Sequence, residues 1–562
     1  MTLTRRGISR LAAIALLPAL ASTGEAATDE RPATLSGNYL AAVSAIRQRD
    51  ASSASGFLSR ALELDPGNPE LVQQAFTQRL AAGNIAGTFD LARLIIATRP
   101  GDSLARTVLG IEAMRAGRFE EAKTHFDTPG VGPIAKLVSG ILSAWAQDAL
   151  GNRDAANAAI GALTGPDWYP IFKGYHQAIL ADLAGKPDEA LRLMRQVYDP
   201  MGSGVRMAEA FARMTARAGN SAAAQKALLD YIARNGDHPL FRVVLDDITA
   251  GRRPDAIVHN AIEGAAELLY QLGVAVNSAG TEDTAASYLN LALYLNPASD
   301  IAPLALGDVW QAARNHDAAV AAYAAVPANS PLAHQATIAG ALSLDALDRT
   351  DEAAAKLKAL LAKDASDTQA ATALGDIYRG RQRYAEAADA YDIAVKGART
   401  LARSDWRLLF SRGISYERTS RWSAAELDFK KALELWPDQA QVLNYLGYTW
   451  VERNTNIDEA LGMIRKAVDQ RPDDGYIVDS LGWAYYKLGQ YVQAATYLQR
   501  AILLQPEDPT INDHYGDALW QIGRRLEATF QWAHARDFKP EPDELARILD
   551  KLKNGLQADK KG

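Results

Sequence analysis

Apolar residues in the C-terminal half of the chain follow a helical period, and the whole pattern recurs about every 34 residues. The clearest unit spans 472–506. Its apolar positions are Val478, Leu481, Tyr485, Ala494, Leu498 and Ala501. This spacing predicts two helices, with a turn at Gly489 between them and the end of the second helix at Pro506.

A small residue marks the same point in each of eight such units. These residues are Gly273, Gly307, Ala341, Gly375, Gly413, Gly447, Gly482 and Gly516. An alanine follows each one after twelve or thirteen positions, at Ala285, Ala319, Ala353, Ala387, Ala425, Ala460, Ala494 and Ala528. A period of this length indicates stacked helical hairpins, with the small residues where two helices cross. The pattern therefore predicts a helical solenoid.

The residues inside each unit resemble the tetratricopeptide repeat (TPR). Unit 403–437 carries Leu409, Gly413, Tyr416, Ala425, Phe429, Ala432 and Pro437. Unit 507–540 carries Tyr515, Gly516, Ala528, Trp532, Ala535 and Pro540. The resemblance implies an all-α fold, a right-handed superhelix of about thirteen hairpins. We expect eight regular repeats within 251–540, with an extra inter-helix loop at 396–403.

Residues 27–250 carry a looser form of the pattern, for which we expect five or six degenerate repeats. Two hairpins are marked by Gly110, Ala122 and Phe126, and by Ala178, Ala190 and Met194. The stretch Thr249–Asp255 looks like the joint between the two halves. After Pro540, residues 543–556 predict a capping helix over the last apolar face, followed by a basic tail within 541–562.

The first residues of the chain have the order of a secretory signal. Three arginines, Arg5, Arg6 and Arg10, precede the apolar stretch 11–21. Small residues follow it at Gly24 and Ala26. We expect a signal peptide over 1–26 that is cleaved near Ala26, with an uncleaved anchor as the alternative. The mature chain is then expected in the periplasm, without a transmembrane segment.

Charge and composition narrow the function further. The formal net charge is -7, which argues against a nucleic-acid groove because such a groove needs a basic stripe. The chain has no cysteine, which excludes disulfides, thiolate catalysis and zinc held by cysteine. We find no phosphate loop, dinucleotide fingerprint, GxSxG or HExxH, so we predict neither catalysis nor a cofactor.

One histidine has neighbours that suit a metal. His514 lies beside Asp513 and Asp517, and these residue types can ligate a cation. The competing interpretation is a solvated first turn of a repeat helix, which we favour, so no metal site is predicted. The acidic pairs Asp473–Asp474 and Glu507–Asp508 precede helices, and we interpret them as N-caps.

The TPR resemblance also identifies positions that would line the concave groove. In the last three repeats we expect a partner-binding groove at Asn444, Tyr448, Asp479, Trp483, Tyr486, Asp513, Asp517 and Trp520. Val451, Glu452, Lys487 and Gln521 share these positions. The predicted groove is aromatic and acidic, and it suits a basic or neutral extended segment rather than a terminal carboxylate. The alternative is that Trp483 and Trp520 only pack between neighbouring helices.

Residues 441–540 resemble the C-terminal repeats of LbcA-type TPR adaptor lipoproteins of the bacterial envelope. The phrases LNYLGYTWVER, IDEALGMIRKAV and DSLGWAYYKLG carry this resemblance. It implies an adaptor that binds a carboxyl-terminal processing protease and brings peptidoglycan hydrolases to it. The acylated cysteine of those lipoproteins is missing here. Two alternatives stay open: a scaffold for assembling a pilus or secretion machine, and the recognition arm of an envelope enzyme.

Overall fold

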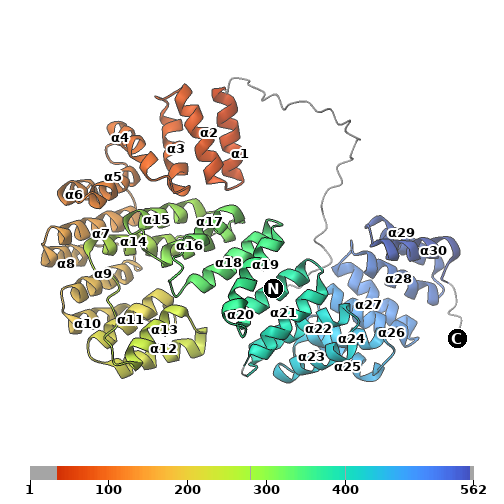
Figure 1. Cartoon of the computed structure of the whole chain (residues 1–562). Helices are drawn as coiled ribbons and strands as arrows, with labels where there is room; N and C mark the ends of the chain where they lie inside the picture. Colours follow the sequence, from red (N-terminus) through yellow and green to blue (C-terminus); the bar gives the residue numbers. More distant parts are fainter. Residues whose placement is uncertain (1–33, 129, 279, 399, 557–562) are drawn as a thin grey trace.

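The computed structural model describes residues 34–128, 130–278, 280–398 and 400–556, and in these residues all regular structure is helical. Of the thirty α-helices in the described residues, all but α13 and α30 pair in chain order into fourteen hairpins (Figure 1). The predicted all-α solenoid is therefore confirmed. The predicted signal peptide and the basic end of the tail lie outside the described residues.

Hairpins of the N-terminal half begin at residue 35. Their helices are α1 (Leu35–Arg47), α2 (Ala51–Leu64), α3 (Pro69–Ala81), η1 (Ala86–Thr88), α4 (Phe89–Thr98), α5 (Ser103–Arg115), α6 (Phe119–Phe126), α7 (Pro133–Ala149), α8 (Arg153–Ala162), α9 (Tyr169–Leu183), α10 (Pro187–Val197), α11 (Val205–Arg217), α12 (Ser221–Asn235) and α13 (Pro239–Thr249).

The regular array follows in the C-terminal half. Its helices are α14 (Ala261–Ala275), α15 (Glu282–Leu295), α16 (Ile301–Ala312), α17 (His316–Ala324), α18 (Ala333–Ala346), α19 (Thr350–Lys363), α20 (Thr368–Gly380), α21 (Tyr384–Gly397), η2 (Arg403–Asp405), α22 (Trp406–Arg418), α23 (Trp422–Leu435), α24 (Ala440–Glu452), α25 (Ile457–Gln470), α26 (Gly475–Lys487), α27 (Tyr491–Leu504), α28 (Pro509–Gln521), α29 (Arg525–Asp537) and α30 (Pro542–Asn554).

The recurring glycines lie at the helix crossings, as the sequence predicts. A Cβ at Gly482 would lie 2.6 Å from Cγ of Leu498, on the second helix of the same hairpin. At Gly516 the same atom would lie 2.5 Å from the ring of Trp532. The eight recurring alanines are fully buried against these crossings. Close helix packing therefore explains why the pattern tolerates only small residues there.

Local signals set the ends of the helices. Asp474 accepts hydrogen bonds from the backbone amides of Tyr476 and Ile477 at the start of α26, and Asp508 caps α28 in the same way. Gly489 follows α26 with φ +73°, the left-handed turn that glycine adopts without strain. The second residue of each acidic pair, Asp474 or Asp508, is thus an N-cap, as predicted. Helix α21 ends at Gly397, so the predicted loop at 396–403 begins two residues too early, and η2 directly precedes α22.

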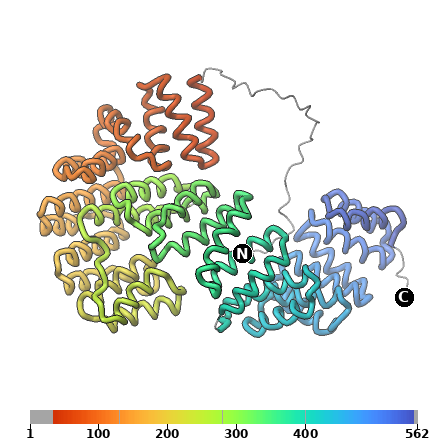
Figure 2. Tube along the Cα trace, in the orientation of Figure 1, coloured from red at the N-terminus to blue at the C-terminus, as the bar shows by residue number. Residues whose placement is uncertain are grey.

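The two halves of the chain pack against each other. Helix α14 packs against α7 and α9, and α15 packs against α3 and α5, so the first hairpin of the regular array lies on the first helices of the N-terminal repeats. The tube view shows this hairpin beside the arc of N-terminal repeats (Figure 2). Leu268, Leu269 and Leu291 share one apolar core with residues such as Ile111 and Trp145.

Polar side chains fix this contact at its edges. Asn290 of α15 donates to the carbonyls of Leu80 and Ala81 at 3.0 and 2.9 Å, at the end of α3. Gln78 donates to Asp283 at 3.3 Å. The α14–α15 hairpin therefore covers part of the first helices α3, α5, α7 and α9.

Candidate protein-binding surface

First helices line the inner face of the C-terminal array. The first-helix pairs α18 and α20, α20 and α22, α24 and α26, and α26 and α28 approach one another more closely than successive second helices do. The predicted groove residues all lie on α24, α26 and α28. They fall into three groups with different surroundings.

Trp483 lies at the centre of an aromatic stack and is only partly buried. Its ring is parallel to that of Tyr486, with centroids 4.6 Å apart, and to that of His514, with centroids 3.9 Å apart. The indole N–H of Trp483 donates to Glu452 on the preceding first helix. Lys487 lies over the indole ring, with Nζ 5.3 Å from its centroid. Trp483 therefore both packs between α24 and α28 and presents part of its surface to solvent.

Asp479 and His514 form a buried pair across α26 and α28. The His514 Nδ1 atom lies 3.0 Å from Oδ1 of Asp479. Burial alone would lower the pKa of His514. The charge and hydrogen bond of Asp479 outweigh it, with help from Asp513 and Asp517, and raise the pKa above its usual value. His514 is 8% exposed and paired, which corrects the predicted solvated first turn.

Asp513 and Asp517 face the capping helix rather than an open groove. Lys551 of α30 lies 2.8 Å from Oδ2 of Asp513 and 2.7 Å from Oδ2 of Asp517. Oδ1 of Asp517 also accepts from the indole N–H of Trp532 at 3.0 Å. Burial raises the pKa of Asp517, although the Lys551 ammonium opposes that shift. Trp520 is partly buried beside Trp532, with ring centroids 5.2 Å apart.

These contacts correct the expected acidic lining. Asp479, Asp513 and Asp517 are 7%, 6% and 4% exposed, so each carboxylate is buried and paired rather than free to attract a partner. Each pairs with a residue 34 to 38 positions later, on the next first helix or on α30. They stabilise the stacking of neighbouring units. Among the predicted groove residues on α26, Trp483 and Tyr486 keep partly exposed rings, and Glu452 and Lys487 beside them are exposed.

Helix α24 contributes a partly buried polar and aromatic edge. Asn444 and Tyr448 are partly buried, whereas Val451 is buried in the core. Oδ1 of Asn444 has no hydrogen-bond partner although it is enclosed. The next residue, Tyr445, donates from its hydroxyl to Glu417 on the preceding first helix at 3.2 Å. Asn444, Tyr448, Trp483 and Tyr486 thus remain the predicted groove residues that line a surface without the cover of α30.

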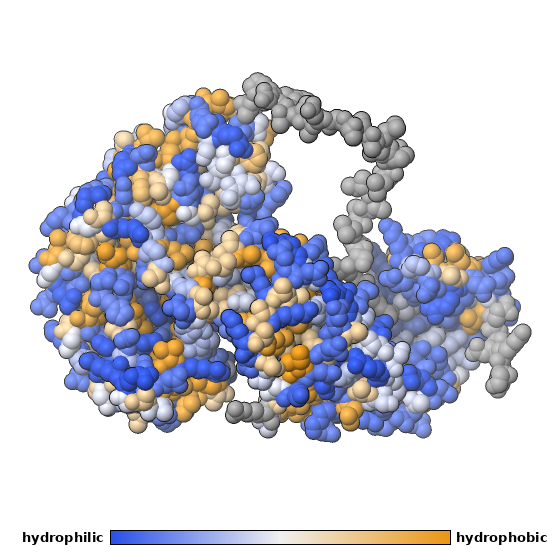
Figure 3. Space-filling model, viewed as in Figure 1, coloured by the Kyte–Doolittle hydropathy of each residue, from blue (hydrophilic) through white to orange (hydrophobic). Residues whose placement is uncertain are grey.

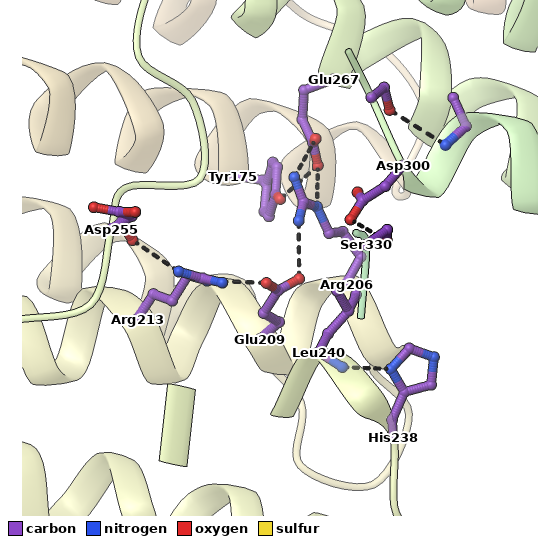
Figure 4. Close-up of polar contacts among 12 residues, drawn as sticks. Tyr175, Arg206, Glu209, Arg213, His238, Leu240, Asp255, Glu267, Asp300 and Ser330 are labelled. Carbon is purple, nitrogen blue, oxygen red and sulfur yellow. Dashed lines mark hydrogen bonds and ion pairs between the residues drawn. The ribbon is translucent and has the colours of Figure 1, made fainter. Parts of the chain in front are cut away.

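A second hollow lies at the joint between the halves and was not predicted. This cleft of about 430 Å³ lies between α11, α13, the loop before α14, and the start of α16. Figure 4 shows a chain of charges across it, from Glu267 through Arg206 and Glu209 to Arg213. Arg206 donates to Glu267 at 3.0 and 2.8 Å.

Tyr175 of α9 completes that charge chain. Its hydroxyl donates to Glu267 at 2.8 Å. Burial and the neighbouring Glu267 carboxylate raise the pKa of Tyr175. Burial would lower the pKa of Arg206, but the Glu267 and Glu209 carboxylates outweigh it and raise that pKa. The network ties α9, α11 and α14 together. The repeat pattern carries no signal for the links to Glu267, which join residues 61 and 92 positions apart.

The surface between these sites is mixed. On the face in Figure 3, hydrophobic residues form small patches separated by hydrophilic ones. Within the described residues no helix is both long enough and apolar enough to cross a membrane. In that same part of the chain, no group of three or more His, Asp or Glu side chains is placed to hold a metal ion.

Comparisons with known proteins agree with the repeat assignment. Residues 390–531 and 338–402 match two family models, both described as tetratricopeptide repeat. A TPR repeat-containing protein of Pseudomonas aeruginosa is 38% identical over 98 residues. That match covers 17% of this chain and 17% of the relative. The C-terminal half therefore contains TPR repeats.

Two solved structures resemble the chain over most of its length. One is the Cut9–Hcn1 hetero-tetramer of the APC/C, 14% identical with a TM-score of 0.37, over 93% of this chain and 96% of that chain. The other is yeast Tom70, 12% identical with a TM-score of 0.34, over 93% of this chain and 95% of that chain.

Proposed function

We propose that this chain is a non-catalytic scaffold that binds protein partners on the inner face of its C-terminal array. The observation that carries the proposal is the partly exposed aromatic surface of Tyr448, Trp483 and Tyr486 on successive first helices. Aromatic side chains bury a large area on binding at small entropic cost, so they are preferred anchors at interfaces. TPR arrays commonly present such extended inner faces to other proteins.

The sharper form of the proposal is an exported adaptor of the bacterial envelope. Signal-like residues 1–26 and the LbcA-type phrases within 441–540 support it. In this form the inner face holds a carboxyl-terminal processing protease and peptidoglycan hydrolases in the periplasm. We expect mass spectrometry of the periplasmic fraction to find a mature N-terminus near Ala27. An intact Met1 in the cytoplasm would contradict the export.

Two other functions use the same surface. A scaffold for a pilus or secretion machine would hold several components along the array. The recognition arm of an envelope enzyme would hold the substrate for a catalytic partner. Affinity capture from envelope extract, with mass-spectrometric identification, separates the three: protease with hydrolase, machine components, or an enzyme and its substrate. Capture of no protein at all would contradict the scaffold itself.

The Trp483→Ala variant tests whether the aromatic stack is the anchor. As a central aromatic contact, Trp483 should contribute about 2 kcal/mol or more to partner binding. Its stack with His514 also predicts a loss of stability, so affinity is measured per folded molecule on the same preparation. Leu427→Ala is the control, because Leu427 is 69% exposed on the outer helix α23. Unchanged affinity for Trp483→Ala would rule out the inner-face assignment.

A further inference from the structure

Helix α30 is the most weakly embedded helix of the C-terminal array. Ile548 is its one buried side chain, whereas nine of the residues of α28 are buried. It follows a connection in which Lys539 has φ +57° and prolines stand at 540 and 542. An element with so few buried contacts opens at a smaller free-energy cost than the core of the array.

The surface beneath α30 is polar as well as aromatic. Lys551 lies between Asp513 and Asp517, and Glu544 accepts a hydrogen bond from Thr510 at 2.8 Å. The end of α30 lies against Trp520, since a Cβ at Gly555 would be 2.4 Å from the indole ring. Leu552 also packs on the same core. This surface would open as one face of α28 if α30 moved away.

The charges beneath α30 do not balance. One ammonium group serves two carboxylates, and Oδ1 of Asp513 is enclosed without any hydrogen-bond partner. The neighbouring His514 side chain is already bonded to Asp479. A buried carboxylate oxygen without a donor is costly. Helix α30 therefore fits this acidic surface incompletely.

We propose that α30 is a displaceable cover, and that the surface of Asp513, Asp517 and Trp520 beneath it binds an arginine-bearing amphipathic helix of a protein partner. The planar guanidinium group offers several donors in a fork, so one arginine can bond to both carboxylates where lysine offers a point charge. Helices that lie in a groove of a helical receptor are a common mode of recognition. The inference rests on the proposed scaffold function and names a partner segment for it.

Because α30 is tethered to the array, a partner helix must compete with its high effective concentration. Because α30 is joined to α29 by four residues, its effective concentration at this surface is on the order of mM or higher. A free helix can replace it only by making contacts that α30 lacks, such as a donor to Oδ1 of Asp513. A partner with arginine at the position of Lys551 supplies that donor.

The absence of cysteine in the chain permits a direct test. Thr510→Cys with Glu544→Cys places two thiols on α28 and α30, which a short bismaleimide can bridge in the full-length protein. The probe is a fluorescein-labelled peptide of residues 541–556 carrying Lys551→Arg. Fluorescence anisotropy should show binding to the unbridged protein and at least tenfold weaker binding once α30 is bridged. The same peptide carrying Lys551→Glu should bind at least tenfold more weakly to the unbridged protein.

Hydrogen exchange supplies an independent readout. Amides of α30 should exchange at least tenfold faster than those of α28 in the unmodified protein, and bridging should slow them. Equal peptide binding before and after bridging, no binding to the unbridged protein, or exchange in α30 as slow as in α28 would overturn the proposal. None of these results bears on the capture experiment, so the scaffold function can stand if the cover does not.

Discussion

Gly482→Leu should open the last repeats of the array far more than Gly489→Ala. A Cβ at Gly482 would lie 2.6 Å from Cγ of Leu498 and 3.1 Å from its backbone nitrogen. The side chain of Leu498 can rotate, but the backbone of α27 can move only if the two helices separate. At Gly489 nothing lies within 4 Å of the added atom, so only the left-handed φ of +73° resists the substitution.

These geometries set the expected magnitudes. Forcing a leucine into the α26–α27 crossing should cost about 3 kcal/mol or more, at the upper end for overpacked cores. An alanine in the left-handed turn should cost about 1 kcal/mol. A difference of about 2 kcal/mol corresponds to a more than tenfold difference in the equilibrium for local opening.

Hydrogen exchange with mass spectrometry can measure this opening helix by helix. Each repeat contacts its neighbours, so the damage from Gly482→Leu should be confined to α24–α30, with α16–α19 unchanged. A global melting midpoint is less informative, because long repeat arrays depart from two-state unfolding. Equal exchange in the two variants, or a loss spread evenly to α16, would refute the packing assignment of Gly482.

Two further perturbations test the buried charges. Because the pKa of His514 is raised, its pair with Asp479 should stabilise the array fully below about pH 6.5 and less as the pH rises through the raised value. His514→Gln should remove this pH dependence of unfolding; an unchanged pH profile would contradict the pairing. Arg206→Met should cost about 3–5 kcal/mol by taking the ion-pair partner from the buried Glu267 carboxylate, whereas Arg242→Met, at an exposed side chain of α13, should stay within about 0.5 kcal/mol. Similar unfolding free energies for these two variants would contradict the network.

The helical pairing could be predicted from the sequence because its causes are local. Gly482 and Leu498 lie sixteen positions apart in one hairpin, so the crossing repeats with the sequence. The packing of α14 and α15 on the N-terminal repeats could not be predicted in this way. Its contacts, such as Asn290 with Leu80, join residues 210 positions apart and occur once. No periodic pattern records a contact that occurs once.

The acidic residues of the groove were wrongly assigned to an open surface for a reason that the sequence could have revealed. The repeat places Lys551 34 residues after Asp517, and His514 35 residues after Asp479. Neighbouring first helices touch at just such equivalent positions. A search for opposite charges one repeat apart would have predicted that Asp479 and Asp517 stabilise the array. It would have left Trp483 and Tyr486 as the accessible part of the site.

Site-specific photocrosslinking tests the central claim most directly. A benzoylphenylalanine placed at Tyr448 or Lys487 lies on the first helices, whereas one at Leu427 or Leu503 lies on the outer helices, where these leucines are 69% and 79% exposed. In envelope extract, we expect a discrete crosslinked protein from the two inner positions and none from the outer ones. Equal crosslinking from both faces, or crosslinking from the outer face alone, would contradict a scaffold that holds its partners in the concave array.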